Sequence, residues 1–225
     1  MMKKTVVYIY AMSHDNGFAP CVENEWLTLA CCMGAKNGGM RKYAADNFNV
    51  GNTVYILALC GKALAGKAKL GEQAVFRPIY LAKIDEVLEM TEYYTKGGRA
   101  TGRKDDVYQV IDGKLVSKEN NPHQSASCQE KDSGGQYVLC SRQFTYWGNK
   151  CGESGHEIEQ DFPWLFRDRD KHDSGKMGIR DRITFRNYIV EKDFPEFEEK
   201  AKTWSWFPKQ ADCCNIISNY GISEN

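Results

Sequence analysis

The chain has 225 residues, of which 42% are hydrophobic and 12% aromatic, so it can bury a sizeable core. Thirty basic residues balance thirty acidic ones. This balance excludes the global positive charge that drives tight non-specific binding to long nucleic acids, and favours a small ligand or a locally basic surface.

The sequence lacks the signals of membrane and secreted proteins. No stretch approaches the roughly 20 apolar residues that cross a bilayer, and the N-terminus has no small-residue cleavage site. We therefore expect a cytoplasmic protein with no membrane partner. The nine cysteines are an odd number and include the adjacent pairs Cys31-Cys32 and Cys213-Cys214, which argues against a disulfide framework. Because paired Cys-x-x-Cys clusters are missing, we expect reduced, mostly buried thiols and no metal site.

The first predicted element is a buried strand over residues 5–12, TVVYIYAM, which is apolar almost throughout. A polar turn follows at residues 13–17, and binding groups often lie directly after a buried strand. A second apolar run covers residues 27–32. A short helix is predicted over residues 41–46 and a further strand over residues 52–60.

The middle of the chain alternates strands with polar loops. A strand is predicted over residues 74–88, with an edge or a bulge at Pro78 because proline cannot donate a ladder hydrogen bond. The basic loop over residues 96–106 is predicted to be mobile. Asp112-Gly113 lies between the apolar runs VYQVI and KLV, which predicts a β-hairpin with a two-residue turn.

The last third mixes short elements. Residues 118–135 are predicted to form a long polar loop, residues 136–147 a strand and residues 193–204 a helix. Strands dominate the first two-thirds of the chain and helices appear late. This order favours an α+β fold in one domain over residues 1–225, with residues 151–225 as a helical C-terminal extension.

Residues 61–67 have the glycine and lysine spacing of a phosphate-binding loop and follow a predicted strand. However, Ala68 stands where a hydroxyl group should reach magnesium, and Gly71 interrupts the helix whose N-terminus would hold phosphate. We therefore expect a solvated connection between two strands. Looser contact of Lys62 or the neighbouring lysines with a phosphate is the alternative.

Two kinds of catalytic group are candidates. His14 and Asp15 could act as an acid–base pair, because imidazole titrates near neutral pH and a carboxylate can orient it. Their other interpretation is the capping of turn amides. Cys31 or Cys32 could act as a nucleophile if His14 or His123 served as its base, although burial in the core is the more common place for such a thiol.

Aromatic and polar residues near the same strands are candidate ligand contacts. Phe18, Tyr80 and Trp147 could stack on a base, each contributing ~1–3 kcal/mol if a base binds there. Asn16 and Arg41 could supply polar contacts. Aromatic residues in strands belong to the core more often than to a ligand site, so one or two of the three are expected to line a pocket.

Four segments, taken in order, carry a family resemblance. They are HDNGFAP at 14–20, LTLACC at 27–32, PIYLAKIDEVL at 78–88 and VLCSRQFTYWG at 138–148. Together they resemble the second nucleotide-modification-associated domain family, most strongly over residues 3–150. The resemblance implies a bacterial or phage setting in systems that modify DNA bases, with a nucleotide or modified base, and possibly DNA, as the partner. Arg142, in the last segment, is a further candidate ligand contact.

The pattern of strand, loop and strand over residues 51–88 is also similar to the PUA-like and EVE modules, which hold a modified base in a pocket. This similarity implies a twisted mixed β-sheet or partial barrel with short flanking helices. No motif specifies a cofactor or an oligomeric state.

The leading hypothesis is a reader or accessory factor that recognises a nucleotide or modified base. The alternatives are an enzyme acting on a nucleotide or DNA base, and a phage or defence factor that sequesters a nucleotide signal. The leading hypothesis requires the turn after the first strand and the aromatic stretch near residue 146 to meet around a common cavity.

Overall fold

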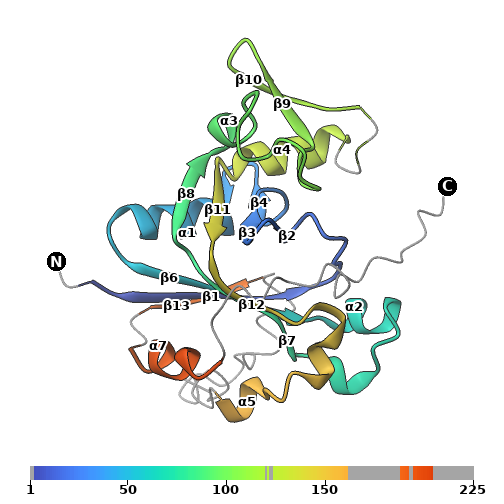
Figure 1. Cartoon of the computed structure of the whole chain (residues 1–225), viewed down its shortest axis with the longest axis vertical. Helices are drawn as coiled ribbons and strands as arrows, with labels where there is room; N and C mark the ends of the chain where they lie inside the picture. Colours follow the sequence, from blue (N-terminus) through green and yellow to red (C-terminus); the bar gives the residue numbers. More distant parts are fainter. Residues whose placement is uncertain (1–2, 120, 122–123, 162–187, 193–194, 205–225) are drawn as a thin grey trace, which may run out of the picture.

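A five-stranded sheet lies at the centre of the molecule (Figure 1), in a computed structural model that describes residues 3–119, 121, 124–161, 188–192 and 195–204. The order of its strands is β12-β7-β6-β1-β13. Their bounds are β1 Thr5–Met12, β6 Thr53–Cys60, β7 Pro78–Lys83, β12 Gln143–Tyr146 and β13 Tyr188–Lys192. β1 and β6 run parallel, whereas the other neighbours are antiparallel. The sheet is therefore mixed.

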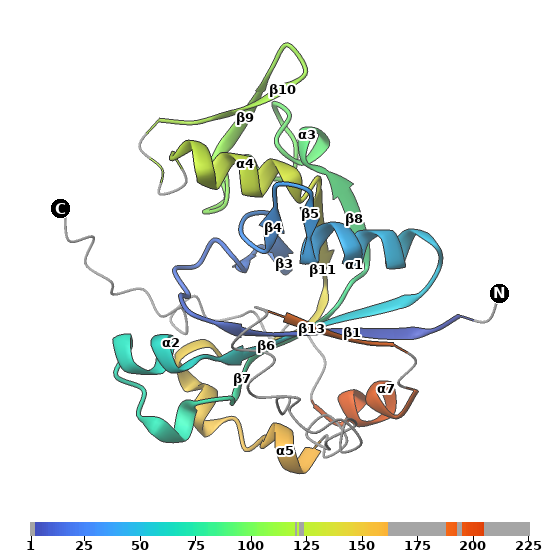
Figure 2. The ribbon, with the colours of Figure 1, turned by 180° about the vertical axis from the view of Figure 1, so that it is seen from behind.

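Both faces of this sheet are covered, which explains the apolar run of β1. Val6 and Tyr8 belong to a core shared with helix α1 (Met40–Asn49), whereas Val7 packs in a second core with helix α7 (Pro195–Lys202). Figures 1 and 2 show the two helices on opposite sides of the sheet. The predicted strands at 5–12 and 52–60 are confirmed, because side chains that alternate in direction along a strand are buried on both sides.

A second sheet lies on the same side of the five-stranded sheet as helix α1. Its strand order is β2-β3-β11-β8, and every pair is antiparallel. The bounds are β2 Cys21–Glu23, β3 Trp26–Leu29, β8 Glu86–Glu89 and β11 Tyr137–Ser141. Leu27, Leu29 and Leu139 join the core below it, whereas Val138 and Cys140 face a third core formed with Tyr93 and other residues above.

The remaining elements are short. They are β4 Gly34–Ala35, β5 Gly38–Gly39, α2 Lys62–Lys67, η1 Glu72–Ala74, α3 Met90–Tyr93, β9 Tyr108–Ile111, β10 Lys114–Ser117, α4 Ala126–Gly134, η2 Gly148–Glu153 and α5 Ile158–Asp161. This content confirms the α+β class. The described strands form separate sheets and not a closed barrel. The PUA-like resemblance stays a prediction.

Two ribbons pass from one sheet to the other at a corner near Asp85. The predicted continuous strands at 74–88 and 136–147 are each divided there into two strands, β7 with β8 and β11 with β12. The Asp85 carboxylate accepts hydrogen bonds from the backbone N–H of Arg142 (2.6 Å), the backbone N–H of Gln143 (3.2 Å) and the Gln143 side-chain amide (2.6 Å). The Ser141 hydroxyl adds two hydrogen bonds, accepting from the Gln143 backbone N–H (3.1 Å) and donating to the Gln143 carbonyl (3.0 Å), so two side chains hold the corner.

The structure confirms the predicted hairpin turn at Asp112-Gly113 and the predicted irregularity at Pro78. Asp112 and Gly113 have φ angles of 49° and 73°, the left-handed values of the predicted two-residue hairpin turn between β9 and β10. The register of β6 and β7 shifts between Ala58 and Leu59, where Leu59 pairs with Pro78. This irregularity is the bulge expected at the proline.

The predicted long loop over 118–135 is wrong, because its second half forms helix α4. Ser125 caps this helix by accepting a hydrogen bond from the backbone N–H of Cys128. Asp132, on its buried side, accepts bonds from the Tyr108 hydroxyl (2.9 Å) and the Cys32 backbone N–H (2.7 Å). Polarity misled the prediction, since most of the helix is solvent-exposed. The predicted helices at 41–46 and 193–204 are present as α1 and α7, with residues 193–194 outside the described chain.

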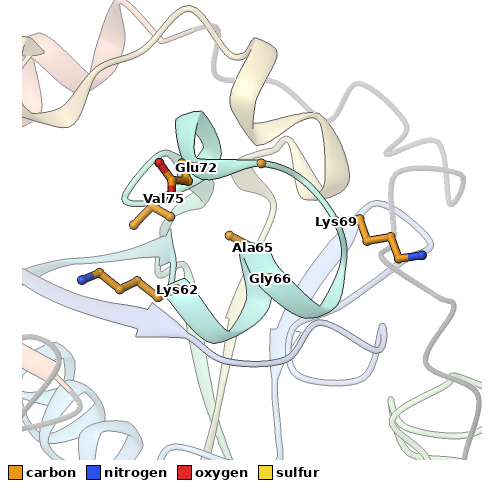
Figure 3. Close-up of a pocket in the computed structure, with 7 residues that line it drawn as sticks. Lys62, Ala65, Gly66, Lys69, Glu72 and Val75 are labelled. Atoms are coloured by element: carbon orange, nitrogen blue, oxygen red, sulfur yellow. The ribbon is translucent and has the colours of Figure 1, made fainter.

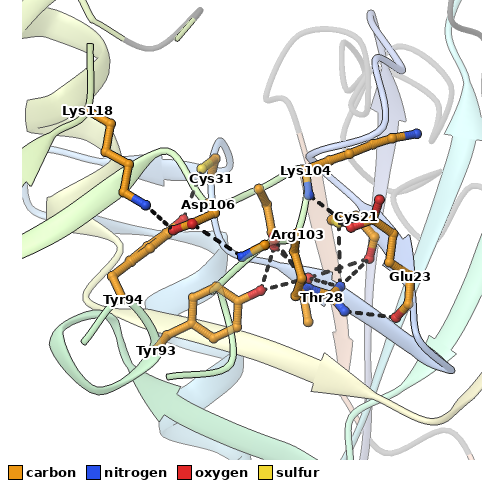
Figure 4. Close-up of polar contacts among 12 residues, drawn as sticks. Cys21, Glu23, Thr28, Cys31, Tyr93, Tyr94, Arg103, Lys104, Asp106 and Lys118 are labelled. Carbon is orange, nitrogen blue, oxygen red and sulfur yellow. Dashed lines mark hydrogen bonds and ion pairs between the residues drawn. The ribbon is translucent and has the colours of Figure 1, made fainter. Parts of the chain in front are cut away.

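The basic loop predicted to be mobile is anchored by a buried ion pair (Figure 4). Arg103 lies 3.3 Å from the Asp105 carboxylate and donates to the Glu23 carbonyl (2.8 Å) and to Thr28 Oγ1 (3.0 Å). Asp105 also accepts from Thr28 Oγ1 (2.6 Å) and the Tyr93 hydroxyl (2.7 Å). Because every partner in this network is hydrogen-bonded, the buried charges are compensated and the loop is fixed against β2 and β3.

Replacing Arg103 should therefore destabilise the fold strongly. Arg103→Met leaves the Asp105 carboxylate buried without its charge partner, and we expect the free energy of unfolding to fall by roughly 3–5 kcal/mol in urea denaturation. The exposed neighbour Lys104 supplies the control, since Lys104→Met should change the free energy of unfolding by only about 0.5 kcal/mol. Equal effects of the two substitutions would show that the pair does not hold the loop.

Candidate functional site

The carboxyl ends of the parallel strands β1 and β6 lie side by side. The Gly61 backbone N–H donates to the Met12 carbonyl at 3.0 Å, and a Cβ atom on Gly61 would lie 2.5 Å from the same oxygen. Only glycine permits this approach, which brings the turn after β1 against the start of α2. Ligands commonly bind at such an edge, because the loops that leave neighbouring parallel strands open onto it together.

A buried carboxylate lies in the turn after β1. Asp15 is fully buried, and its Oδ2 accepts a hydrogen bond from the Tyr146 hydroxyl at 2.5 Å, although 131 positions separate the two residues in sequence. The Gly17 backbone N–H provides a second hydrogen bond to the carboxylate. Asp15 Oδ1 has no hydrogen-bond partner. Buried polar atoms in folded proteins are almost always paired, so this oxygen marks an incomplete polar site.

Tyrosine hydroxyl groups lie near the carboxylate. The hydroxyls of Tyr10 and Tyr80 are hydrogen-bonded at 2.8 Å within the core. Both tyrosines interact electrostatically with Asp15, and Tyr10 also does so with Cys32, which lies at the exposed rim. Burial raises the pKa of both phenols, so they remain neutral and act as hydrogen-bonding groups.

The environment of Asp15 changes its ionisation. Burial raises the pKa of its carboxyl to about 6, while the hydrogen bonds from Tyr146 and from the Gly17 backbone oppose that rise. A carboxyl group with a pKa near neutrality can accept or donate a proton at working pH. Asp15 is therefore equipped for hydrogen bonding in either protonation state and for acid–base chemistry.

The neighbouring His14 faces solvent and joins the two loops. Its Nδ1 lies 2.9 Å from Ser13 Oγ and its Nε2 lies 2.9 Å from Lys67 Nζ. Partial desolvation, with the Lys67 charge as a second cause, lowers the pKa of the imidazole, which favours the neutral ring that accepts from the ammonium group. His14 and Asp15 thus have separate partners, and the expected acid–base pair between them is not formed.

A groove opens beside this edge, between α2 and η1 (Figure 3). Its volume is about 770 Å³, and its lining includes Lys62, Lys69, Glu72 and Val75. Figure 3 shows Lys62 and Lys69 extending from opposite ends of the α2 segment. Lys62–Lys67 form a six-residue helix, capped by Gly61, within the connection between antiparallel strands, so the predicted solvated connection contains a helical turn.

The residues predicted to stack on a base are packed among protein atoms. Tyr80 is fully buried and Phe18 is 9% exposed. Trp147 is partly exposed and packs its ring against His156 and Trp204 at centroid distances of 5.5 and 5.6 Å. The turn after β1 and the aromatic stretch do meet, at the Asp15–Tyr146 hydrogen bond. In the described part of the chain they meet as a buried contact between side chains, and the groove given by the structure lies beside this contact, between α2 and η1.

Arg41 was predicted to contact a ligand, but it is a fully buried structural residue. Its guanidinium donates to the backbone carbonyls of Cys32 (2.8 Å), Tyr137 (2.6 Å) and Asp132. These bonds tie α1 to the loop after β3, to β11 and to α4. With its donors used in this way, the Arg41 side chain offers no group to a ligand in this structure.

The two adjacent cysteines have different environments. Cys31 is fully buried with its Sγ 3.4 Å from the Tyr94 hydroxyl, and burial raises the pKa of its thiol well above the usual value. Cys31 is therefore poorly suited to act as a nucleophile. Cys32 is exposed and its φ angle is 59°. His123, the other predicted base, lies outside the described residues.

Three other predicted or missed residues are exposed near the site or beyond it. Asn16 is exposed beside Asp15, and Arg142 is exposed at the corner between the sheets. Lys67 contacts His14, although sequence reasoning gave it no role in the acid–base site. Tyr146 was also missed as a partner of Asp15, because its apolar neighbours suggested a core aromatic and no sequence signal reports a contact so distant along the chain.

The sequence of the chain matches a known protein family. The family model described as nucleotide modification associated domain 2 matches residues 4–175, more than half of the chain. The chain belongs to this family. No curated protein and no solved structure gives a significant match. Membership in nucleotide modification associated domain 2 supports a role in nucleotide modification systems.

The described residues of this nucleotide modification associated domain contain neither a cluster of metal-binding side chains nor a membrane-spanning helix. No three His, Cys, Asp or Glu side chains come together there as metal ligands. Within the same part of the chain, no helix is both long and apolar enough to pass through a bilayer.

The ionisation of Asp15 should make stability depend on pH. Its native pKa of about 6 exceeds the ordinary value of 3.8, so the native state holds the proton more tightly. The resulting stabilisation is full below about pH 4 and is lost as pH rises through 6. Relative to wild type, Asp15→Asn should therefore gain up to about 3 kcal/mol of unfolding free energy between pH 3.5 and 7.5 in urea denaturation.

A second variant checks the cause. Tyr146→Phe removes a hydrogen bond that lowers the pKa of Asp15, so the pH-dependent loss of stability should extend to higher pH than in the wild type. A difference between wild type and Asp15→Asn that stays constant across this pH range would rule out a raised pKa at Asp15.

Proposed function

We propose that the protein recognises a nucleotide or modified nucleobase at the carboxyl ends of β1 and β6, as a reader or accessory factor in a nucleotide modification system. The observation that carries this proposal is Asp15 Oδ1, a buried acceptor without a partner. Nucleobases present N–H groups in a flat ring, and a carboxylate is a strong acceptor for them. Because this oxygen is buried, binding requires the turn after β1 to move away from it.

The cationic residues nearby suit the other end of a nucleotide. Lys67 joins the turn through His14, and Lys62 and Lys69 line the adjacent groove of about 770 Å³. Ammonium groups bind phosphate as point charges, without a fixed donor geometry. The balanced charge of the whole chain fits recognition of a small phosphorylated ligand through these local cations.

Binding of mononucleotides tests the proposal. In calorimetric titrations, AMP and CMP should bind more tightly than purine riboside monophosphate, because the first two carry an exocyclic amine that can donate to Asp15 and the unsubstituted purine has no donor on that edge. Asp15→Asn keeps an oxygen for Tyr146 and presents an amide donor in place of Oδ1. We expect its affinity for AMP or CMP to fall at least about tenfold, since a charge-assisted hydrogen bond is lost and two donors face each other.

The controls separate base from phosphate recognition. Asp112→Asn, at the tip of the distant β9–β10 hairpin, should leave binding unchanged. Lys67→Gln should weaken binding of AMP but not of adenosine. Absence of binding to every mononucleotide, or equal affinities of wild type and Asp15→Asn, would refute the proposed site.

One observation favours an enzyme as the second candidate. The pKa of Asp15, near 6, suits a general acid or base at neutral pH. In that case conversion of a nucleotide or an oligonucleotide, followed by liquid chromatography and mass spectrometry, should show a rate that changes with an apparent pKa near 6. Asp15→Asn should reduce turnover about 100-fold or more while substrate still binds. The reader function predicts the opposite, namely lost binding and no conversion by the wild type.

A further inference from the structure

A second polar feature lies at the corner between the two sheets, around Trp26 on β3. The guanidinium carbon of Arg99 lies 4.1 Å from the centre of the Trp26 ring, and that of Arg142 lies 4.4 Å from it. Both distances are well within the range of cation–π attraction. Two arginines from segments far apart in sequence are thus held over one indole.

The two arginines differ in their charge partners. Arg99 forms an ion pair with Glu86, so its charge is compensated. Arg142 is exposed, and within the described part of the chain no carboxylate lies in ion-pair distance of its guanidinium. Its backbone N–H is fixed by the Asp85 carboxylate at 2.6 Å. Arg142 therefore carries an uncompensated charge on a backbone that is held in place.

Stacking on an indole prepares a guanidinium group for an anion. The ring contacts the flat face of the group, whereas its N–H donors lie in the plane and stay available. These donors form a fork that matches two oxygens of a phosphate group. Because Trp26 restricts the side chain before binding, less conformational entropy is lost when a phosphate is bound.

We propose that Arg142, held over Trp26, binds a backbone phosphate of a nucleic-acid strand, at a subsite separate from the groove and from Asp15. The position of Arg142, between β11 and β12, supports a polymeric ligand. From Arg142 to Tyr146 the chain advances four strand residues, or about 13 Å. At the roughly 3.4 Å axial rise of a stacked duplex strand this length corresponds to about four nucleotide steps, and a more extended single strand covers it in fewer, so a short strand can reach both places.

The test measures binding of a fluorescein-labelled ten-residue oligothymidylate to the full chain by fluorescence anisotropy between 25 and 200 mM salt. Arg142→Gln should weaken binding about three- to tenfold at the lowest salt. It should also reduce the magnitude of the salt slope by about 0.7, the value for one phosphate contact on a single strand. Lys114→Gln, on the exposed hairpin strand β10, removes the same charge and should have neither effect.

Two further arms identify the chemistry. Trp26→Leu should weaken binding although Arg142 is retained, because the guanidinium loses its stacking surface. An oligothymidylate with uncharged methylphosphonate linkages should bind wild type and Arg142→Gln equally. Circular dichroism melting checks that each variant folds. If Trp26→Leu does not fold, the result with Arg142→Gln alone decides the test.

Three results would overturn the inference. They are no binding of the oligothymidylate by wild type at 25 mM salt, the same affinity and salt slope for Arg142→Gln, and competition by inorganic phosphate or polyglutamate as effective as by unlabelled oligothymidylate. The outcome is separable from that at the Asp15 site, because mononucleotide binding there depends on Asp15 and not on Arg142.

Discussion

The carboxylate of Asp85 holds the corner on which the rest of the arrangement depends. Two chain segments, β7 with β8 and β11 with β12, leave one sheet and enter the other at this point, and Asp85 accepts three hydrogen bonds from Arg142 and Gln143. The bend fixes where β12 begins and therefore where its far end delivers Tyr146 to Asp15. It also fixes the backbone of Arg142 above Trp26. Both proposed contacts with a ligand are thus positioned by one turn of the sheet.

The buried polar groups of this fold differ in how completely they are hydrogen-bonded, and this difference distinguishes groups that stabilise the fold from the group proposed to bind a ligand. The Arg41 guanidinium uses its donors on three backbone carbonyls, and Arg103 with Asp105 forms a network in which each member has partners. Such groups fix loops against sheets and have nothing left to offer a ligand. Asp15 is equally buried but keeps one oxygen without a partner. Because the buried Arg41, Arg103 and Asp105 side chains are hydrogen-bonded, the unpaired oxygen of Asp15 stands out as a candidate contact for a ligand.

Sequence reasoning predicted features that depend on near neighbours and missed those that depend on distant contacts. The strand over 5–12 and the turn at Asp112-Gly113 follow from local patterns, namely a continuous apolar run and residues that adopt positive φ angles. That the turn after the first strand holds binding groups stays a prediction. The partner of Asp15 could not be foreseen, since Tyr146 is 131 positions away. The burial of Arg41 could not be foreseen either, because only the carbonyls of three other segments make it favourable.

The balanced charge of the chain sets the kind of recognition that these contacts can provide. With equal numbers of acidic and basic residues, long-range attraction adds little to the affinity for a polyanion. Discrimination then has to come from short-range groups held in fixed geometry, such as a carboxylate oxygen buried away from water or a guanidinium stacked on an indole. A buried acceptor strongly disfavours any ligand that leaves it unpaired, so its contribution is larger for specificity than for affinity. The proposed function as a reader depends on such selectivity, because a reader has to distinguish one base from close chemical relatives.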